Sequence, residues 1–293
     1  MKLLREFVDE SLEGDWSRLA DIDPSGCYDP NKPIAGSDWL KCPGRSFDCD
    51  DCELSRAVYR EVWGLEFPRY RGDTMNSFRT VFGRERITRR VVDVPWAFVG
   101  SAADERFALP DRLRDRVRDF FWTYHTIGNF IPLPNAAVDG KTLNMYRAGI
   151  WKDSFGAFLS AIRMYLDGRG MNCGNPQLPE RFVKLMDANA FFWDRYRGRF
   201  EEYVHDFFLE EYFDGGGNVI GVPLVYWWDK SLSADEYVAA ATRFLDLSEK
   251  VIAARAERIV MALQMNGGNM VGDRRGQSPI VYLKRLRSEN EGN

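Results

Sequence analysis

Residues 233–263 read SADEYVAAATRFLDLSEKVIAARAERIVMAL, a stretch without glycine or proline. Ser233 and Glu236 have the spacing of a capping box, in which the serine hydroxyl binds the glutamate N–H and the glutamate side chain reaches back to the serine N–H. This pattern marks the start of a helix. We therefore predict one helix from Ser233 to about Leu263, which is the first indication of a mainly helical fold.

Outward from this stretch, apolar residues at helical spacing predict further helices. The predicted ranges are 1–20, 54–63, 110–124, 153–166 and 179–213, the last broken near Gly198. Asp73 or Thr74 is of a type that caps helices, and such a helix would run to about Gly83. Residues 126–134 contain a glycine and two prolines, which predicts a loop or a short strand. The predicted fold class is mainly α, or α+β with a small sheet, in a single compact domain.

Composition divides the chain into three segments. Residues 1–52 combine the predicted N-terminal helix with an irregular lobe that is rich in Asp, Pro, Gly and Cys. Residues 53–265 form the main, mostly helical domain, and residues 266–293 form a polar C-terminal tail. Hydrophobic residues make up 45% of the 293 residues and aromatic residues 14%, which is typical of a globular protein with its own core.

Charge and hydropathy exclude two classes of partner. The formal net charge of −4 argues against a broad nucleic-acid-binding surface, which needs concentrated positive charge. The first eight residues, MKLLREFV, already contain three charged residues and lack the apolar core of a secretion signal. No apolar run approaches the roughly 18 residues that a membrane span requires. We therefore expect a cytoplasmic protein that does not contact a membrane.

Four of the five cysteines cluster near the N-terminus, at Cys27, Cys42, Cys49 and Cys52. The last pair has the x2 spacing that can clasp one metal ion through a tight turn. A tetrahedral zinc site needs four such ligands, so the cluster predicts a structural zinc ion. The alternatives are reduced thiols that bind nothing, or a redox or iron–sulfur centre. An odd number of cysteines in a reducing compartment argues against structural disulfides.

The chain has two histidines, so any imidazole chemistry rests on His125 or His205. His125 follows Arg118 by about two helical turns, so both side chains point the same way on a continuous helix. The pair resembles the Arg-x4–6-His motif of HEPN ribonucleases, in which the two residues act on an RNA phosphodiester. The alternative is that His125 ends helix 110–124 and binds its last carbonyls. His205 lies in a Glu-x-x-His, but the chain has no second motif to complete a di-iron bundle.

Several short motifs lie in the middle of the chain, over roughly residues 55–260. They are Asp73-Thr74-Met75-Asn76-Ser77-Phe78, Thr126-Ile127-Gly128-Asn129, Pro134, Asp139-Gly140-Lys141-Thr142-Leu143-Asn144-x-x-Arg147, Asp153-x-Phe155, Ile162-Arg163 and Phe207-Phe208-Leu209. In this pattern the chain resembles a family of uncharacterised bacterial proteins. The resemblance implies no catalytic residues, because the family has no established activity. The cysteine segment lies outside the resemblance, so a zinc ion there would be a local addition.

The motifs contain a set of polar residues that stand at the ends of elements or beside apolar runs. The set is Asp73, Asn76, Ser77, His125, Thr126, Asn129, Asn144, Arg147 and Asp153. One interpretation is a pocket that binds an anionic ligand through Arg147 and the Gly128–Asn129 backbone, with Asp73 or Asp153 as a base. The other is a buried hydrogen-bond network that fixes loop 126–147 against the helices.

Common catalytic templates are absent from the sequence. Gly140-Lys141-Thr142 imitates the end of a P-loop, but Asn135 stands where the first glycine belongs, so Asp139-Gly140 predicts a simple turn. No G-x-S-x-G, H-E-x-x-H, G-x-G-x-x-G or EF-hand pattern occurs. These absences remove the common hydrolase, metalloprotease and dinucleotide-binding templates.

Two hypotheses for the function remain. The first is an intracellular bacterial enzyme that acts on a nucleotide or RNA phosphodiester, with catalytic residues His125, Arg118, Arg147 and Asp153. Its ligand-binding residues are Asp73, Asn76, Ser77, Thr126, Asn129 and Asn144. The second is a non-enzymatic binding protein of a bacterial defence or toxin-type system, which contacts a protein partner or a second copy of itself through exposed aromatic residues and the zinc lobe.

Overall fold

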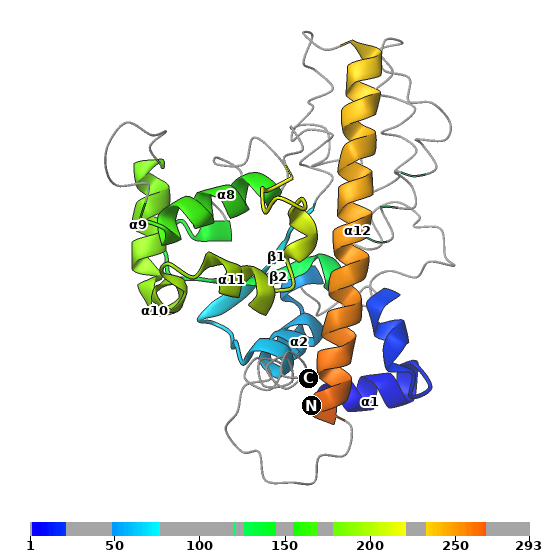
Figure 1. Ribbon diagram of the computed structural model, residues 1–293. Coiled ribbons are helices and arrows are strands. Elements are labelled where there is room, and N and C mark those ends of the chain that lie inside the picture. Colours follow the sequence, from blue (N-terminus) through cyan, green and yellow to red (C-terminus); the bar gives the residue numbers. More distant parts are fainter. Residues whose placement is uncertain are drawn as a thin grey trace, which may run out of the picture.

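The computed structural model describes residues 2–21, 49–76, 126–144, 155–168, 178–220 and 233–267, together with residues 116, 120 and 123. Across these residues the fold is mainly α with one small sheet, as predicted (Figure 1). The α-helices with described bounds are α1 (Lys2–Ser11), α2 (Glu53–Trp63), α8 (Phe155–Leu166), α9 (Glu180–Ala188), α10 (Ala190–Trp193), α11 (Phe200–Asp206) and α12 (Ala234–Gly267). Short 3-10 turns are η1 (Trp16–Asp21), η3 (Cys49–Asp51), η6 (Ile127–Asn129), η7 (Asp194–Tyr196) and η8 (Glu210–Tyr212).

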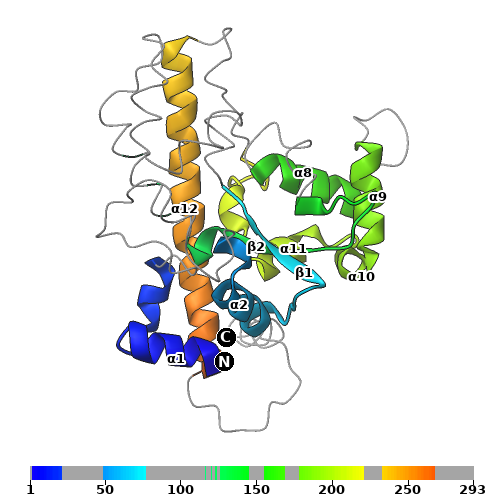
Figure 2. The same cartoon turned by 180° about the vertical axis from the view of Figure 1, so that it is seen from behind.

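Helix α12 is the long axis of the molecule, and the predicted capping box begins it. Ser233 Oγ accepts a hydrogen bond from the Glu236 N–H (3.3 Å), and the Ser233 N–H donates to Glu236 Oε2 (2.8 Å). The helix continues to Gly267, about one turn beyond the predicted end. It runs beside α1 and η1 on one side and beside α2 and η6 on the other (Figure 1 and Figure 2).

Strands β1 (Tyr70–Thr74) and β2 (Phe130–Pro134) pair in antiparallel register, with Gly72 opposite Pro132. Every residue of β2 is buried, so its backbone needs a partner strand, and β1 supplies it. The prediction that Asp73 or Thr74 caps a helix was wrong, because both residues lie within β1 and the next two residues, 75 and 76, are not helical. The rest of that predicted helix, to Gly83, lies outside the described residues. Gly72 is required for a close approach, since a Cβ there would stand 1.6 Å from the Asp50 carbonyl oxygen.

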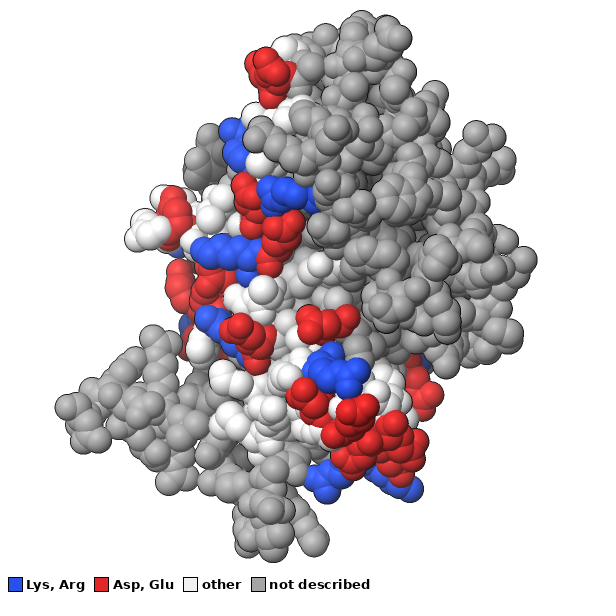
Figure 3. Space-filling view, turned by 90° about the vertical axis from the view of Figure 1, so that its right-hand side faces the viewer, with Lys and Arg blue, Asp and Glu red and all other residues white. Residues whose placement is uncertain are grey.

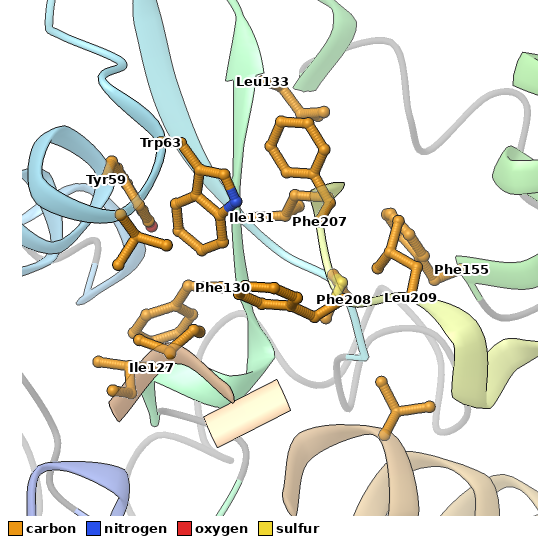
Figure 4. Close-up of a cluster of buried hydrophobic side chains, with 14 of the residues drawn as sticks. Tyr59, Trp63, Ile127, Phe130, Ile131, Leu133, Phe155, Phe207, Phe208 and Leu209 are labelled. Carbon is orange, nitrogen blue, oxygen red and sulfur yellow. The ribbon is translucent and has the colours of Figure 1, made fainter. Parts of the chain in front are cut away.

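Helix α2 ends in a Schellman motif, in which Gly64 takes the left-handed conformation (φ 69°). The Gly64 N–H donates to Arg60 O, and the next N–H donates to Tyr59 O. The last residue of the helix, Trp63, then enters the core. Its indole donates to Asp206 O (2.8 Å) and its ring stacks on Phe207 at 5.7 Å and 11° (Figure 4). This packing joins α2 to α11.

The predicted helical region 179–213 consists of α9, α10, η7, α11 and η8. The predicted break near Gly198 is confirmed, since Gly198 has φ 66°. A second break falls at Asn189, whose side chain donates to Leu185 O (2.8 Å) in place of a continued helix. The same side chain exchanges two hydrogen bonds with the Ala136 backbone (2.9 and 3.1 Å). The break therefore ties the helices to the chain that leaves β2.

Rings from this helical region form an aromatic cluster, which we define as Phe192, Trp193, Tyr196, Tyr203 and Phe207. Phe192 and Trp193 meet edge to face at 4.6 Å, and Tyr203 lies 5.0 Å from Phe207. Tilted and edge-on pairs of this kind are the favoured aromatic geometry. The cluster belongs to one hydrophobic core that also includes apolar residues of α1, α2 and α12.

Two further predictions have outcomes in the described residues. The Asp139–Gly140 turn is confirmed: both residues have positive φ (51° and 68°), and Val138 and Lys141 exchange backbone hydrogen bonds of 2.8 and 3.0 Å. This is the geometry of a two-residue hairpin turn. Of the predicted helix 110–124, residues 116, 120 and 123 are described and are helical, and Phe120 packs edge-on against Phe244 of α12 (5.6 Å).

None of the helices in the described part of the chain combines the length and the apolar content that crossing a bilayer requires. On the side of the molecule where α1 and α12 lie, the described Lys and Arg residues are interspersed with Asp and Glu (Figure 3). The two signs alternate over most of this view, and Asp and Glu residues gather at its lower right.

Candidate functional site

The best-defined polar contact in the core is an amide pair between the end of β1 and η6. Asn129 Oδ1 accepts from the Asn76 backbone N–H (2.9 Å) and from Asn76 Nδ2 (3.3 Å). In return, Asn129 Nδ2 donates to Asn76 O (2.7 Å). Both residues are fully buried, and Tyr212 of η8 donates to Asn76 Oδ1 (3.0 Å). Three segments far apart in the sequence therefore meet at this pair.

Hydrogen bonds also fix the start of η6. Thr126 Oγ1 donates to Thr123 O (2.8 Å), and the Asn129 N–H donates to Thr126 O (2.9 Å). Gly128 lies directly on α12, because a Cβ there would stand 2.2 Å from Ile252 O. The Asn129 amide, which the sequence suggested as part of an anion site, thus already has an acceptor.

Arg255 of α12 lies beneath this segment, fully buried among backbone carbonyls. Its Nη1 donates to Gly128 O (2.6 Å) and Phe130 O (3.0 Å), and its Nε donates to Phe207 O (3.0 Å). Burial lowers the pKa of Arg255 to about 10, since the charged form is favoured by water that is excluded here. One side chain thus fixes η6, β2 and the residue after α11 to the long helix.

Acidic residues gather where η3 meets β1. Asp50 and Asp73 are 4% and 5% exposed, and Thr74 Oγ1 donates to Asp50 Oδ2 (2.7 Å). The Tyr59 hydroxyl donates to the Asp50 carbonyl, and burial raises the pKa of Tyr59 well above its ordinary value. Buried carboxylates next to fixed donors are the kind of group that serves as a general base.

The next acid, Asp51, has two arginine partners. Arg56 donates to both of its carboxylate oxygens (3.0 and 2.9 Å), and Arg71 donates to Oδ2 (2.9 Å). Burial alone would raise the pKa of Asp51, but the hydrogen bonds from the two arginines outweigh burial and lower it. Asp51 is therefore a charged anchor for surface arginines.

The structure brings together five of the predicted ligand-binding residues. Asn144 Nδ2 donates to Gly72 O (3.1 Å), which places it against β1 beside Asp73. With the contacts described above, these residues form the β1 polar cluster, which we define as Asp73, Asn76, Thr126, Asn129, Asn144 and Tyr212. The sixth predicted ligand-binding residue, Ser77, and the predicted catalytic residues Arg118, His125, Arg147 and Asp153 lie outside the described residues.

The predicted zinc ligands are described only in part. Cys27 and Cys42 lie outside the described residues, and for Cys49 only the backbone, at the start of η3, is described. Cys52 is buried directly before α2, and its thiol donates to Ser55 Oγ (3.4 Å). Within the described ranges, no three His, Cys, Asp or Glu side chains gather in a way that could hold a metal ion. His205 instead places Nδ1 3.0 Å from Glu210 Oε1.

Sequence reasoning missed Arg255, Tyr212 and Asp50. Arg255 carries a readable signal, because helical spacing places it on the same apolar face as Ile252 and Ile259. A charged residue on such a face must find partners in the core. Tyr212 and Asp50 carry no comparable signal, since their partners come from segments distant in the sequence.

Searches of protein-family models, of curated proteins and of solved structures return no match for this chain. The function of the β1 polar cluster must therefore be argued from its own geometry.

Proposed function

We propose that this protein is an enzyme that acts on a nucleotide or RNA phosphodiester in the bacterial cytoplasm, with its active site at the β1 polar cluster. In this proposal Asp73 is the general base, His125 and Arg118 act on the phosphodiester, and Arg147 binds its charge. Asp153 completes the set of catalytic groups.

One observation carries the proposal. Polar residues from four separate segments, at positions 73–76, 126–129, 144 and 212, converge on the end of a buried two-stranded sheet. Each of the amide side chains is held by hydrogen bonds to backbone or to another side chain, so the cluster is rigid. Asp73 stands within it as a buried carboxylate, and His125 precedes Thr126 directly in the chain. Rigid placement of acid–base groups is what catalysis requires.

A hydrolysis assay with two matched histidine variants tests the proposal. The full chain is incubated with bis(p-nitrophenyl) phosphate, with 2′,3′-cyclic nucleotides and with a short single-stranded RNA. We expect activity on at least one substrate, and we expect His125→Ala to lower kcat by about 100-fold or more, the usual contribution of a general acid or base. His205→Ala is the control, because that imidazole contacts Glu210 in a partly buried pair outside the β1 polar cluster. No activity on any substrate, or full activity in His125→Ala, would contradict the proposal.

We also propose that Cys27, Cys42, Cys49 and Cys52 hold one structural zinc ion. The position of Cys52 supports this proposal, since Ser55 Oγ at 3.4 Å can donate to a thiolate as readily as it accepts from a thiol. Metal analysis of the purified full chain is the test. We expect one zinc per chain, and a loss of half or more of it in Cys52→Ser. A zinc content well below stoichiometric ends this proposal without touching the first.

A further inference from the structure

The edge of the molecule below α10 carries arginines and exposed aromatic rings in close contact. We define the arginine–aromatic surface as Arg56, Phe67, Arg69, Arg71, Phe191 and Arg195. It joins the turn between α2 and β1 to α10 and η7, which approach each other in both cartoon views (Figure 1 and Figure 2). Tyr70 makes the link, with its ring 6.0 Å from Phe191 and 5.8 Å from Phe192.

Two stacked pairs define this surface. The Arg56 guanidinium carbon lies 3.9 Å from the centre of the Phe67 ring, and the Arg69 guanidinium carbon lies 3.9 Å from the centre of the Phe191 ring. The two rings are 49% and 42% exposed, and the only other large hydrophobic side chain exposed among the described residues is Met261. Phenylalanine rings and guanidinium planes that remain exposed can stack on the planar groups of a ligand.

Buried carboxylates fix the direction of three of the guanidinium groups. Asp51 is 1% exposed and binds Arg56 and Arg71, whereas the arginine side chains are 36% and 49% exposed. Asp206 is 0% exposed and binds Arg195 (3.0 Å), which is 45% exposed. The carboxylates thus lie inside and the guanidinium groups outside. Four arginines against Asp51, Asp206 and the exposed Glu66 of the same turn leave a net charge of +1, and Asp194 beside Arg195 is paired with Arg197.

We propose that this surface binds single-stranded RNA, the substrate class of the enzyme proposed above, on which this inference rests. Single strands are bound by exposed aromatic and guanidinium planes that stack on bases, together with arginines that bind phosphates. The surface supplies both kinds of group in alternation. It also leads to the site, because Arg71 and Asp73 stand two residues apart on β1 and point to the same side of the strand. A strand bound here therefore lies beside β1, the strand that carries Asp73 of the β1 polar cluster.

Fluorescence anisotropy with a labelled 12-nucleotide oligouridylate RNA and the full chain tests the inference. Loss of one stacked base costs on the order of fivefold or more in affinity, so Phe191→Ala is expected to raise Kd by at least that factor. Phe191→Tyr, which keeps the ring, is expected to restore the wild-type Kd. Arg69→Ala is expected to lower the slope of log Kd against log salt by about 0.7, the value for one lost phosphate contact on a single strand.

Arg163→Ala is the matched control, because Arg163 also lies over a phenylalanine ring, Phe200 at 5.4 Å, but outside this surface. We expect its Kd to equal that of the wild type. Two results overturn the inference: no RNA binding by the wild type at low salt, or binding that Phe191→Ala leaves unchanged. Displacement of the RNA by polyglutamate of equal charge, with no effect of Phe191→Ala, would instead assign the surface to an acidic protein.

The same assay separates this inference from the proposed function. Asp73→Asn is expected to lower kcat by about 100-fold or more and to leave the RNA Kd unchanged. RNA binding without hydrolysis by the wild type contradicts the catalytic proposal alone. Hydrolysis of small phosphodiesters without RNA binding contradicts the inference about this surface alone.

Discussion

The aromatic cluster and the β1 polar cluster are both buried, but their polar side chains differ in hydrogen bonding. Within the described residues, Trp193 Nε1 and Tyr203 Oη have no hydrogen-bond partner, so these side chains are held by the packing of their rings. In the β1 polar cluster, Asn76, Asn129 and Tyr212 bind one another at 2.7–3.3 Å. Ring packing fills the space between helices, whereas hydrogen bonds fix the positions of individual polar atoms. The second kind of region is the one that can serve as a site.

Arg255→Met is expected to have the largest effect, because it removes the donor that three carbonyls of the η6, β2 and Phe207 region share. The substitution leaves these acceptors buried without a donor, which destabilises the folded state, and it removes the cost of burying a charge, which stabilises it. We expect the first effect to be larger, so the free energy of unfolding should fall by about 3 kcal/mol. Chemical denaturation measures this loss. Arg243→Met, at an exposed position of the same helix, should change stability by less than about 0.5 kcal/mol. Equal effects of the two substitutions would show that Arg255 does not fix the cluster.

Alkaline pH should destabilise the protein through its buried phenols. Burial raises the pKa of Tyr59, Tyr196 and Tyr203, so the folded protein keeps protons that the unfolded chain releases above about pH 10. Stability contributed by these groups is thus fully present below pH 10 and falls as pH rises. Arg255 opposes the trend above about pH 10, because burial lowers its pKa, but it is one group against these three phenols.

Urea denaturation at pH 9, 10 and 11 measures this slope. We expect a fall that approaches 1–2 kcal/mol between pH 10 and 11, at about 1.4 kcal/mol per pH unit for each group in net excess. Tyr203→Phe should make the fall shallower, since it removes one of the three phenols. A free energy of unfolding that stays constant or rises between pH 9 and 11 would contradict the burial of these hydroxyls.

A pair of Tyr-to-Phe substitutions compares the two clusters directly, and its effects are the smallest. Tyr212→Phe removes the donor to Asn76 Oδ1 and should lower the free energy of unfolding by about 1–2 kcal/mol. Tyr203→Phe removes a buried hydroxyl that has no partner in the described part of the chain, so stability should stay unchanged or rise slightly. Thermal unfolding of both variants decides the matter. A larger loss in Tyr203→Phe would reverse the comparison.

Much of the fold was predictable because its signals are local. The capping box at Ser233, the break at Gly198 and the turn at Asp139–Gly140 each depend on residues a few positions apart, and all three are confirmed. Asp73 was misassigned to a helix cap because pairing with β2, some 58 residues away, decides its conformation. Local sequence does not reveal such a pairing.

The site was predictable only in part, for the same reason. Asn76, Asn129 and Asn144 could be grouped because polar residues beside apolar runs must find partners. Which atoms they bind depends on Tyr212 and on the Gly72 backbone, which approach from distant segments. Arg255 was the one missed residue that helical spacing alone could have revealed.

The most direct test of the central claim measures activity and stability on one variant, Asp73→Asn. A phosphodiester enzyme that uses Asp73 as its base should lose about 100-fold or more in kcat, while its free energy of unfolding stays within about 1 kcal/mol of the wild type, since the two side chains have the same shape. Full activity in this variant, or a loss of activity that only accompanies a loss of folding, would contradict the claim that the β1 polar cluster is an active site.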